Sequence, residues 1–202
     1  MAGSGKIAAI VLAAGRSTRM GEANKLLAEV GGKPMVRHAV EAALASQARP
    51  VLVVTGHQAD DVRAALAGLD IAFVANSDFA AGLSSSLKAG IRALPKAAAG
   101  ALVLLGDMPR IEAAHLDAMI AAFALEAGLA IIVPVHQGRR GNPVLWPASL
   151  FGEMLALEGD VGARSLLARH AGRVREIELG TDAVLMDVDT PDALARLRGG
   201  AA

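Results

Sequence analysis

Short apolar runs alternate along the chain with segments in which apolar residues recur at helical spacing. The first run, residues 7–13, has the length and β-branched content of a buried strand. Further runs occupy residues 51–55, 71–75, 101–105, 130–135, 144–146, 174–179 and 183–188. Helical spacing is clear between the first two runs, at Met35, Ala39, Val40 and Ala43. This order of elements predicts an α/β fold with a doubly wound, mostly parallel sheet and helices on both faces.

Composition narrows the class of protein. The 202 residues include no cysteine, no tyrosine and one tryptophan, and 20 basic residues balance 20 acidic ones. The lack of cysteine excludes disulfides, cysteine-ligated metals and thiol catalysis. Neutral charge and few aromatic residues disfavour nucleic-acid binding, and no apolar run reaches the roughly 20 residues of a membrane span. We expect a single domain over residues 1–202 that is cytoplasmic and binds neither nucleic acid nor membrane.

The loop after the first apolar run combines glycine with cations. It holds Gly15, Arg16, Arg19 and Lys25 before apolar residues resume at residue 26. Glycine lets backbone N–H groups approach phosphate oxygens closely, while an arginine fork and a lysine point charge can pair with those oxygens. The pattern indicates either a polyphosphate-binding loop or a solvated turn with incidental charges.

Two further polar segments fall beyond the carboxyl ends of predicted strands, where parallel sheets bind ligands. Asn76 follows the run at residues 71–75, and Gly82 leads into Ser84, Ser85 and Ser86 at the start of a helix. Serines in this position can simply cap the helix, or they can present hydroxyl and N–H groups to a ligand.

Asp107 and Asp189 also follow apolar runs. Each can serve the start of the next helix or bind a metal ion, since an unpaired aspartate at the end of a buried strand is costly. Carboxylate oxygens without neighbouring His or Cys suit Mg²⁺. The histidines form no HxxxH pair and the chain has no G-x-S-x-G, which disfavours zinc and serine hydrolases. Together with the cationic loop, the aspartates predict a site for a nucleoside triphosphate and Mg²⁺.

The segment LAAGRSTRMGEANKLL, residues 12–27, resembles the LAAGxSxRMGxxNKL opening of the MobA-like nucleotidyltransferases, and it is most similar to the molybdenum cofactor cytidylyltransferases. The likeness continues in order through GLSSSLKAGI, LGDMP, GRRGNP, GDVGAR and DVDTP, and thus covers nearly the whole chain. It implies a Rossmann-like fold, Mg²⁺ as cofactor, and transfer of a nucleotidyl group from an NTP to a phosphate monoester with release of pyrophosphate.

The resemblance also implies roles for individual residues. Arg19, Lys25 and Asp107 would be catalytic, with Lys25 nearest the α-phosphate, and Asp189 would assist Asp107 in binding Mg²⁺. The nucleotide would contact Leu12, Ala13, Ala14, Gly15, Arg19, Lys25, Asn76, Gly82, Ser84 and Ser85. The pterin phosphate of the acceptor would face Gly141, Asn142, Pro143 and Asp160.

The resemblance favours CTP as nucleotide, because cytidylyl members carry an alanine at the position of Ala14 where guanylyl members tend to carry glycine. Molybdopterin, or the molybdenum cofactor, is then the expected acceptor, and a molybdoenzyme or chaperone the expected protein partner. Some relatives have His in place of Asn142, which leaves the acceptor open. The alternatives are guanylyl transfer to molybdopterin, transfer to methylerythritol phosphate or a sugar phosphate, and a non-catalytic nucleotide-binding module.

Overall fold

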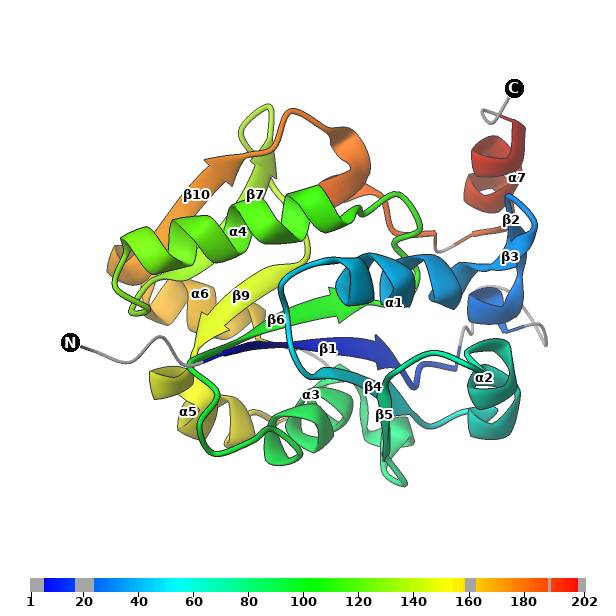
Figure 1. Ribbon diagram of the computed structural model, residues 1–202, viewed down its shortest axis with the longest axis horizontal. Coiled ribbons are helices and arrows are strands. Elements are labelled where there is room, and N and C mark those ends of the chain that lie inside the picture. Colours follow the sequence, from blue (N-terminus) through cyan, green and yellow to red (C-terminus); the bar gives the residue numbers. More distant parts are fainter. Residues whose placement is uncertain (1–5, 17–23, 159–162, 189, 200–202) are drawn as a thin grey trace.

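The computed structural model describes residues 6–16, 24–158, 163–188 and 190–199, and these build one eight-stranded sheet flanked by helices (Figure 1). The strand order is β10-β7-β9-β6-β1-β4-β5, with β8 paired to β7, and β2 and β3 form a separate hairpin. The strands are β1 (Ile7–Ala13), β2 (Glu29–Val30), β3 (Lys33–Pro34), β4 (Val51–Thr55), β5 (Ala72–Ala75), β6 (Gly100–Leu105), β7 (Ile131–His136), β8 (Arg139–Arg140), β9 (Val144–Pro147) and β10 (Val174–Glu178).

The helices lie between the strands in the order that the apolar pattern predicts. The α-helices are α1 (Met35–Ala45), α2 (Ala59–Ala65), α3 (Leu83–Arg92), α4 (Ala113–Leu125), α5 (Phe151–Leu155), α6 (Arg164–Arg169) and α7 (Pro191–Gly199). Short 3₁₀ helices are η2 (Lys25–Leu27), η3 (Phe79–Ala81), η4 (Ala148–Leu150), η5 (Ala171–Arg173) and η6 (Asp182–Leu185). None of the helices described is long and apolar enough to cross a membrane.

Strand β1 is paired on both sides and sets the direction of the sheet. Ala9 aligns with Val51 of β4 and with Leu102 of β6, and both neighbours run parallel to β1. The β4–β5 and β7–β10 pairs are parallel as well. The doubly wound, mostly parallel sheet that the sequence predicts is therefore confirmed, and the carboxyl ends of β1, β4 and β6 meet at one edge.

Strand β9 departs from the parallel arrangement, since it pairs antiparallel with both β6 and β7. Its link to β7 explains the direction. Only residues 137–143 separate the two strands, and they include the short strand β8. A parallel crossover needs about a dozen residues or more, so a link of this length must turn the chain back.

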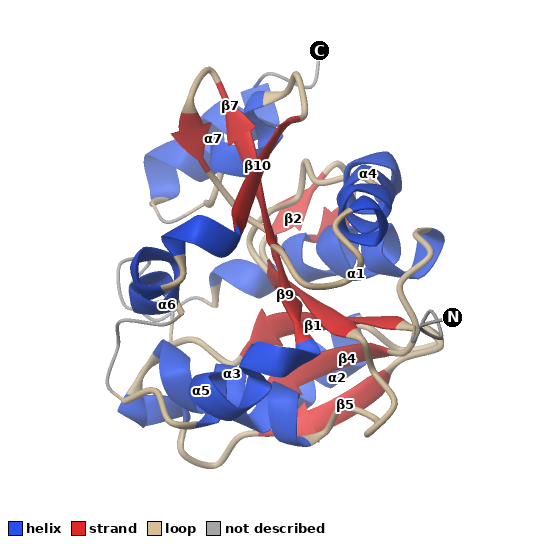
Figure 2. Cartoon of the chain, turned by 90° about the vertical axis from the view of Figure 1, so that its left-hand side faces the viewer, coloured by secondary structure: helices blue, strands red, loops and turns tan. Residues whose placement is uncertain are grey.

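The two faces of β1 pack against different helices, as expected from alternation along a strand. Ala9 and Val11 belong to a buried cluster with residues of α1, α2 and α4. Ile10 and Leu12 belong to a second cluster with residues of α3, α5 and α6. Figures 1 and 2 show α1 and α4 on one side of the sheet and α3 and α5 on the other. The core is thus two layers, one on each face of the sheet, and β1 contributes to both.

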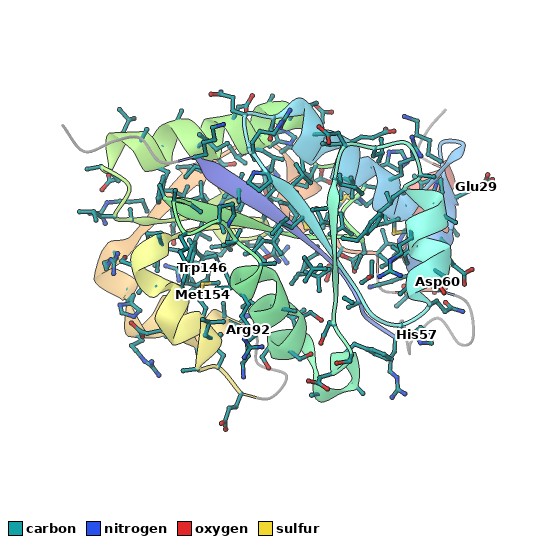
Figure 3. The ribbon with its side chains drawn as sticks, turned by 60° about the horizontal axis from the view of Figure 1, so that its bottom comes forward. Glu29, His57, Asp60, Arg92, Trp146 and Met154 are labelled. Atoms are coloured by element: carbon teal, nitrogen blue, oxygen red, sulfur yellow. The ribbon has the colours of Figure 1, made fainter. Side chains whose placement is uncertain are left out.

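Helix α3 lies unusually close to β1 because Gly90 has no side chain. A Cβ at this position would be only 2.6 Å from Cγ2 of Ile10. Trp146 of β9 and Met154 of α5 fill the same side of the sheet (Figure 3), and both are at most 2% exposed. Their packing fixes the position of α3, whose first turn reaches the carboxyl edge of the sheet.

The predicted strand at residues 183–188 is wrong. This segment forms η6 and an extended stretch, with Ala183 and Val184 buried under α4 and β7. An apolar run of this length does not distinguish a strand from a short buried helical turn. The elements that the pattern does not predict include the β2–β3 hairpin, strand β8 and helix α5.

Thr55 generates a stability prediction. Its hydroxyl is fully buried at the end of β4 and has no hydrogen-bond partner among the described residues. Thr55→Val keeps the shape of the side chain and removes the unsatisfied hydroxyl, so we expect the free energy of unfolding to rise by about 1 kcal/mol. The melting temperature should rise by about 2–4 °C in a thermal scan.

Ser46 supplies the matched control. Its buried hydroxyl donates to the Ala43 carbonyl at 2.8 Å and accepts from the Ala48 N–H at 3.2 Å. Ser46→Ala should therefore lower the free energy of unfolding by about 1 kcal/mol. A Thr55→Val protein that melts below the parent protein would contradict the assignment of an unsatisfied hydroxyl.

Candidate nucleotide-binding site

The carboxyl ends of β1 and β6 open into a cavity of about 380 Å³. Many of the residues expected at a nucleotide site meet here although they are far apart in the sequence. The described lining consists of Leu12, Ala14, Gly15, Arg16, Lys25, Leu26, Phe79, Ala80, Gly82, Leu83, Ser86, Leu105, Gly106, Asp107 and Asp187. Ala13, by contrast, is buried in the cluster on the opposite face of the sheet.

An ion pair between Lys25 and Asp107 lies in this cavity. The Lys25 Nζ donates to Oδ2 of Asp107, and the two side chains are only 15% and 11% exposed. Lys25 begins η2, and the side chain of Asn24 caps this helix by accepting from the Leu26 N–H at 3.0 Å. Asp107 lies two residues beyond Leu105, the last residue of β6. A pair this enclosed holds both charges in defined positions, and loss of either partner leaves an uncompensated buried charge.

The alternative role of Asp107 at the start of a helix is wrong. Helix α4 begins at Ala113, and its N-cap is Glu112, whose backbone N–H donates to Nδ1 of His115 at 3.1 Å. The backbone carbonyl of Asp107 instead accepts from the Val188 N–H at 3.2 Å. The backbone of Asp107 therefore joins the end of β6 to the C-terminal segment, and Asp107 lines the cavity.

Asp187 is a second carboxylate that lines the same cavity, and the sequence reasoning did not select it. The available signal was the alternation in DVDTP, which contains two aspartates. Asp189 lies outside the described residues. Among the residues described, Thr190 provides the cap of α7, because its hydroxyl accepts from the Ala193 N–H at 3.2 Å.

The oxygen donors fit a magnesium-type site. Mg²⁺ is commonly held by one or two carboxylates, with water and substrate phosphates completing its octahedron. Asp107 and Asp187 provide such a pair at one cavity. No group of three or more His, Cys, Asp or Glu side chains within the described part of the chain could hold a metal ion by itself. This donor set suits a metal that arrives with a phosphate ligand.

Asn76 and the serines of α3 form a hydrogen-bond network. The Asn76 Nδ2 donates to the hydroxyls of Ser85 and Ser86 at 2.9 and 3.0 Å, and its Oδ1 accepts from the Asp78 N–H at 3.0 Å. The simple capping alternative is wrong, because the N-cap of α3 is Gly82, with φ of 96°, and the three serines come after it in the helix. The network instead fixes the segment between β5 and α3.

A second cavity, of about 740 Å³, lies on the other side of this segment. Asn76, Ser84 and Ser85 line it, together with Lys88 and Arg92 of α3. The predicted nucleotide contacts are therefore divided between two adjacent cavities, which both include Ala80 of η3.

Arg16, Phe79 and His57 form a cluster that the sequence reasoning missed as a unit. The guanidinium of Arg16 lies over the Phe79 ring, 5.8 Å from its centroid. The centroid of the His57 ring is 6.0 Å from that of Phe79. The backbone N–H of His57 donates to the Ala14 carbonyl at 3.2 Å. Figure 3 shows His57 near the edge of the sheet. A pairwise contact between loops after β1 and β5 leaves no periodic signal in the sequence.

The turn expected to face the acceptor packs against η6. The Gly141 N–H donates to the Pro134 carbonyl at 2.9 Å, and the Asn142 N–H donates to the Val184 carbonyl at 2.8 Å. A Cβ at Gly141 would be 2.1 Å from that Val184 oxygen, so a side chain cannot replace this glycine without moving the chain. Pro143 follows a cis peptide bond. Arg19 and Asp160, the other predicted site residues, lie outside the described residues.

Glu178 forms hydrogen bonds near the tip of the β7–β9 hairpin, which contains this turn. The Gly180 N–H and the Gln137 N–H each donate to its carboxylate at 3.0 Å, and His136 lies 3.4 Å away. These contacts, with that of Gly180 the largest, lower the pKa of Glu178. The carboxylate is therefore ionised at neutral pH and holds the tip of the hairpin.

Comparisons with known proteins assign the chain to a family. A family model described as the MobA-like NTP transferase domain matches residues 9–174. The bifunctional protein GlmU of Kineococcus radiotolerans is 42% identical over 120 residues, which are 58% of this chain and 24% of that protein. The chain spans about a quarter of the length of the curated relatives it matches.

Solved structures are similar over almost the whole chain. Rv0371c from Mycobacterium tuberculosis has a TM-score of 0.82 at 29% identity, covering 96% of this chain and 97% of that one. Its homologue from Mycobacterium sp. strain JC1 has a TM-score of 0.80 at 31% identity, covering 96% of both chains. A complex of Rv0371c with manganese has a TM-score of 0.82 at 29% identity, covering 97% of this chain and all of that one.

The capping of η2 gives a testable prediction. Asn24→Ala removes the acceptor for the buried Leu26 N–H, so we expect the free energy of unfolding to fall by about 1–2 kcal/mol in denaturant titration. Asn24→Asp keeps the oxygen acceptor and is the matched control, with a smaller loss. Equal stability of the alanine variant and the parent protein would show that this hydrogen bond does not stabilise η2.

Proposed function

Because the chain belongs to the MobA-like NTP transferase family, we propose that it is a metal-dependent nucleotidyltransferase that moves a nucleotidyl group from an NTP to a phosphate acceptor. The observation that carries this proposal is the enclosed Lys25–Asp107 pair at the carboxyl ends of β1 and β6, in a cavity that also exposes Gly15. A pure structural ion pair has no need of a cavity or of a glycine loop beside it.

The reaction needs positioning and charge more than a strong base. A phosphate monoester has a second pKa near about 6, so its oxygen is already nucleophilic at neutral pH. That oxygen attacks the α-phosphorus of the NTP, the bond from the α-phosphorus to the bridging oxygen breaks, and pyrophosphate leaves with the bonding electrons. Lys25 can pass from the Asp107 carboxylate to an α-phosphate oxygen, where its charge favours the crowded transition state.

Asp107 and Asp187 would hold the divalent metal, and Asp189 and Arg19 stay predictions of the same site. The metal, when bound, neutralises charge on the transferred and leaving phosphates. The manganese complex of Rv0371c supports a divalent ion in this family fold, and the oxygen-only donor set favours Mg²⁺ here. In the proposed complex Lys25 would pair with the phosphate and Asp107 with the metal, so neither charge would be isolated when their ion pair breaks.

CTP is the proposed nucleotide. Ala14 lines the cavity and is 2% exposed, so its methyl group narrows the space between β1 and η3. A narrower space supports a pyrimidine over a purine. Asn76, Ser84 and Ser85 stay proposed contacts of base and ribose, and Leu12 and Gly82 line the cavity itself.

Molybdopterin is the proposed acceptor, on the likeness of the six motifs to molybdenum cofactor cytidylyltransferases. Gly141, Asn142, Pro143 and Asp160 are the proposed contacts of its phosphate. Other phosphate acceptors give the same release of pyrophosphate, so an assay with molybdopterin, methylerythritol phosphate and sugar phosphates in parallel separates them.

Nucleotide binding can be tested by thermal stability with CTP, GTP, ATP and UTP, each with and without Mg²⁺. A ligand at about 100 times its Kd stabilises by about 2.7 kcal/mol, equivalent to about 5–10 °C for a chain of this size. We expect the largest Mg²⁺-dependent rise with CTP. A larger rise with a purine nucleotide would change the proposed substrate, and no rise with any nucleotide would remove the enzyme proposal.

The ion pair can be tested by turnover. We expect Asp107→Ala to abolish pyrophosphate release and Lys25→Ala to lower kcat by about 10²–10³-fold with a smaller effect on KM, because its charge acts mainly in the transition state. The pair of Lys33 and Glu41, 2.7 Å apart on the surface, is the matched control, and Lys33→Ala should leave kcat unchanged. Full activity of Asp107→Ala would contradict the assignment of Asp107 as a metal ligand.

A further inference from the structure

The Cβ of Phe79 packs closely against two small residues, Gly56 and Ala14. A Cβ placed on Gly56 would be 2.7 Å from Cβ of Phe79 and 2.9 Å from Cβ of Ala14. Gly56 thus permits the base of the Phe79 side chain to approach the carboxyl ends of β1 and β4. The His57 ring lies beside Phe79 with an interplanar angle of 51°. This packing holds the aromatic ring at the wall of the cavity.

The charges that line the cavity leave one cation available for a ligand. Its described lining contains two cations, Arg16 and Lys25, and two carboxylates, Asp107 and Asp187. Lys25 is paired with Asp107, whereas the contact recorded for the exposed Arg16 guanidinium is with the face of Phe79. A triphosphate carries several negative charges, so its binding requires positive charge beyond that of Lys25.

We propose that Phe79 is a positioning residue that holds the Arg16 guanidinium at the mouth of the cavity, where Arg16 binds the β- or γ-phosphate of the nucleotide. The inference rests on the proposed function, because it needs an NTP in this cavity. It adds Arg16 to the proposed contacts of the triphosphate and Phe79 as the residue that positions Arg16.

An aromatic ring suits this role better than an aliphatic side chain. The negative face of the ring attracts the cation. The planar guanidinium uses its face for the ring and keeps the N–H donors at its edge for phosphate oxygens. A long, exposed arginine otherwise loses rotamer freedom when it binds, and the ring removes part of that cost in advance.

The test measures Kd by calorimetry for CTP, CDP and CMP in the presence of Mg²⁺. Arg16→Gln should weaken CTP binding by about 5–20-fold, as expected for a charged hydrogen bond. Phe79→Leu, which keeps apolar volume but removes the ring, should weaken CTP binding by about 2–5-fold. Both variants should leave CMP binding within about twofold, because CMP lacks the outer phosphates; a role of Phe79 in shape alone would weaken all three ligands alike.

Two further comparisons sharpen the result. Phe79→Tyr retains the ring and should restore CTP affinity, which keeps the test valid if Phe79→Leu folds poorly. The double variant of Arg16→Gln and Phe79→Leu should bind CTP no more weakly than Arg16→Gln alone, since the ring acts through Arg16.

The chain also provides a matched pair outside the cavity. The Arg63 guanidinium lies 5.9 Å from the centroid of Phe73, and neither residue lines this cavity. Arg63→Gln and Phe73→Leu should leave all three Kd values unchanged.

The outcomes separate this inference from the proposed function. Suppose that the parent protein binds CTP. If Phe79→Leu then loses equal affinity for CTP and CMP, or if the affinity losses of the two single variants add up in the double variant, the role of Phe79 is overturned and the nucleotide site is not. A parent protein that binds none of the three cytidine nucleotides overturns CTP as the substrate, and the same variants are then compared with the nucleotide that gives the largest thermal shift. A parent protein that binds no nucleotide at all overturns the proposed function and this inference with it.

Discussion

The ion pair between Lys25 and Asp107 is the contact on which the site depends, because it brings η2 against the segment that follows β6. Its enclosure is possible only since β1 and β6 are parallel neighbours and finish at the same edge. Both charges are then kept at the end of an apolar sheet, where water screens them weakly. A site built this way is organised before a ligand arrives.

The two-layer core supplies the rigidity that the pair requires. β1 contributes alternate residues to both layers, so the loop that follows it starts from a strand fixed on both faces and both edges. On one side Gly90 brings α3 against Ile10, and the network around Asn76 holds the start of α3 and the segment that carries Phe79. Loops that would be mobile on their own are thereby anchored to elements of the sheet.

The sequence alone was sufficient where the signal is local. The apolar runs placed the parallel strands, and Lys25, Asp107 and Gly15 follow strand ends, so their meeting at one cavity follows from topology. Tertiary contacts decided the rest. The direction of β9 depends on the length of its link to β7, η6 has the apolar content of a strand, and Asp187 and the Arg16–Phe79 contact become recognisable only when separate loops are placed together.

The hydrogen bond from Val188 to the Asp107 carbonyl, together with Asp187 in the cavity wall, has a consequence for the order of folding. Synthesis proceeds from the N-terminus, so the segment around Val188 emerges after every strand of the sheet. A nascent chain that has emerged as far as β9 already contains β1, β4, β5 and β6, but it lacks the segment that closes the site around Asp107. The cavity around Asp107 is therefore complete only when the segment with Asp187 and Val188, which follows every strand of the sheet in the sequence, is in place.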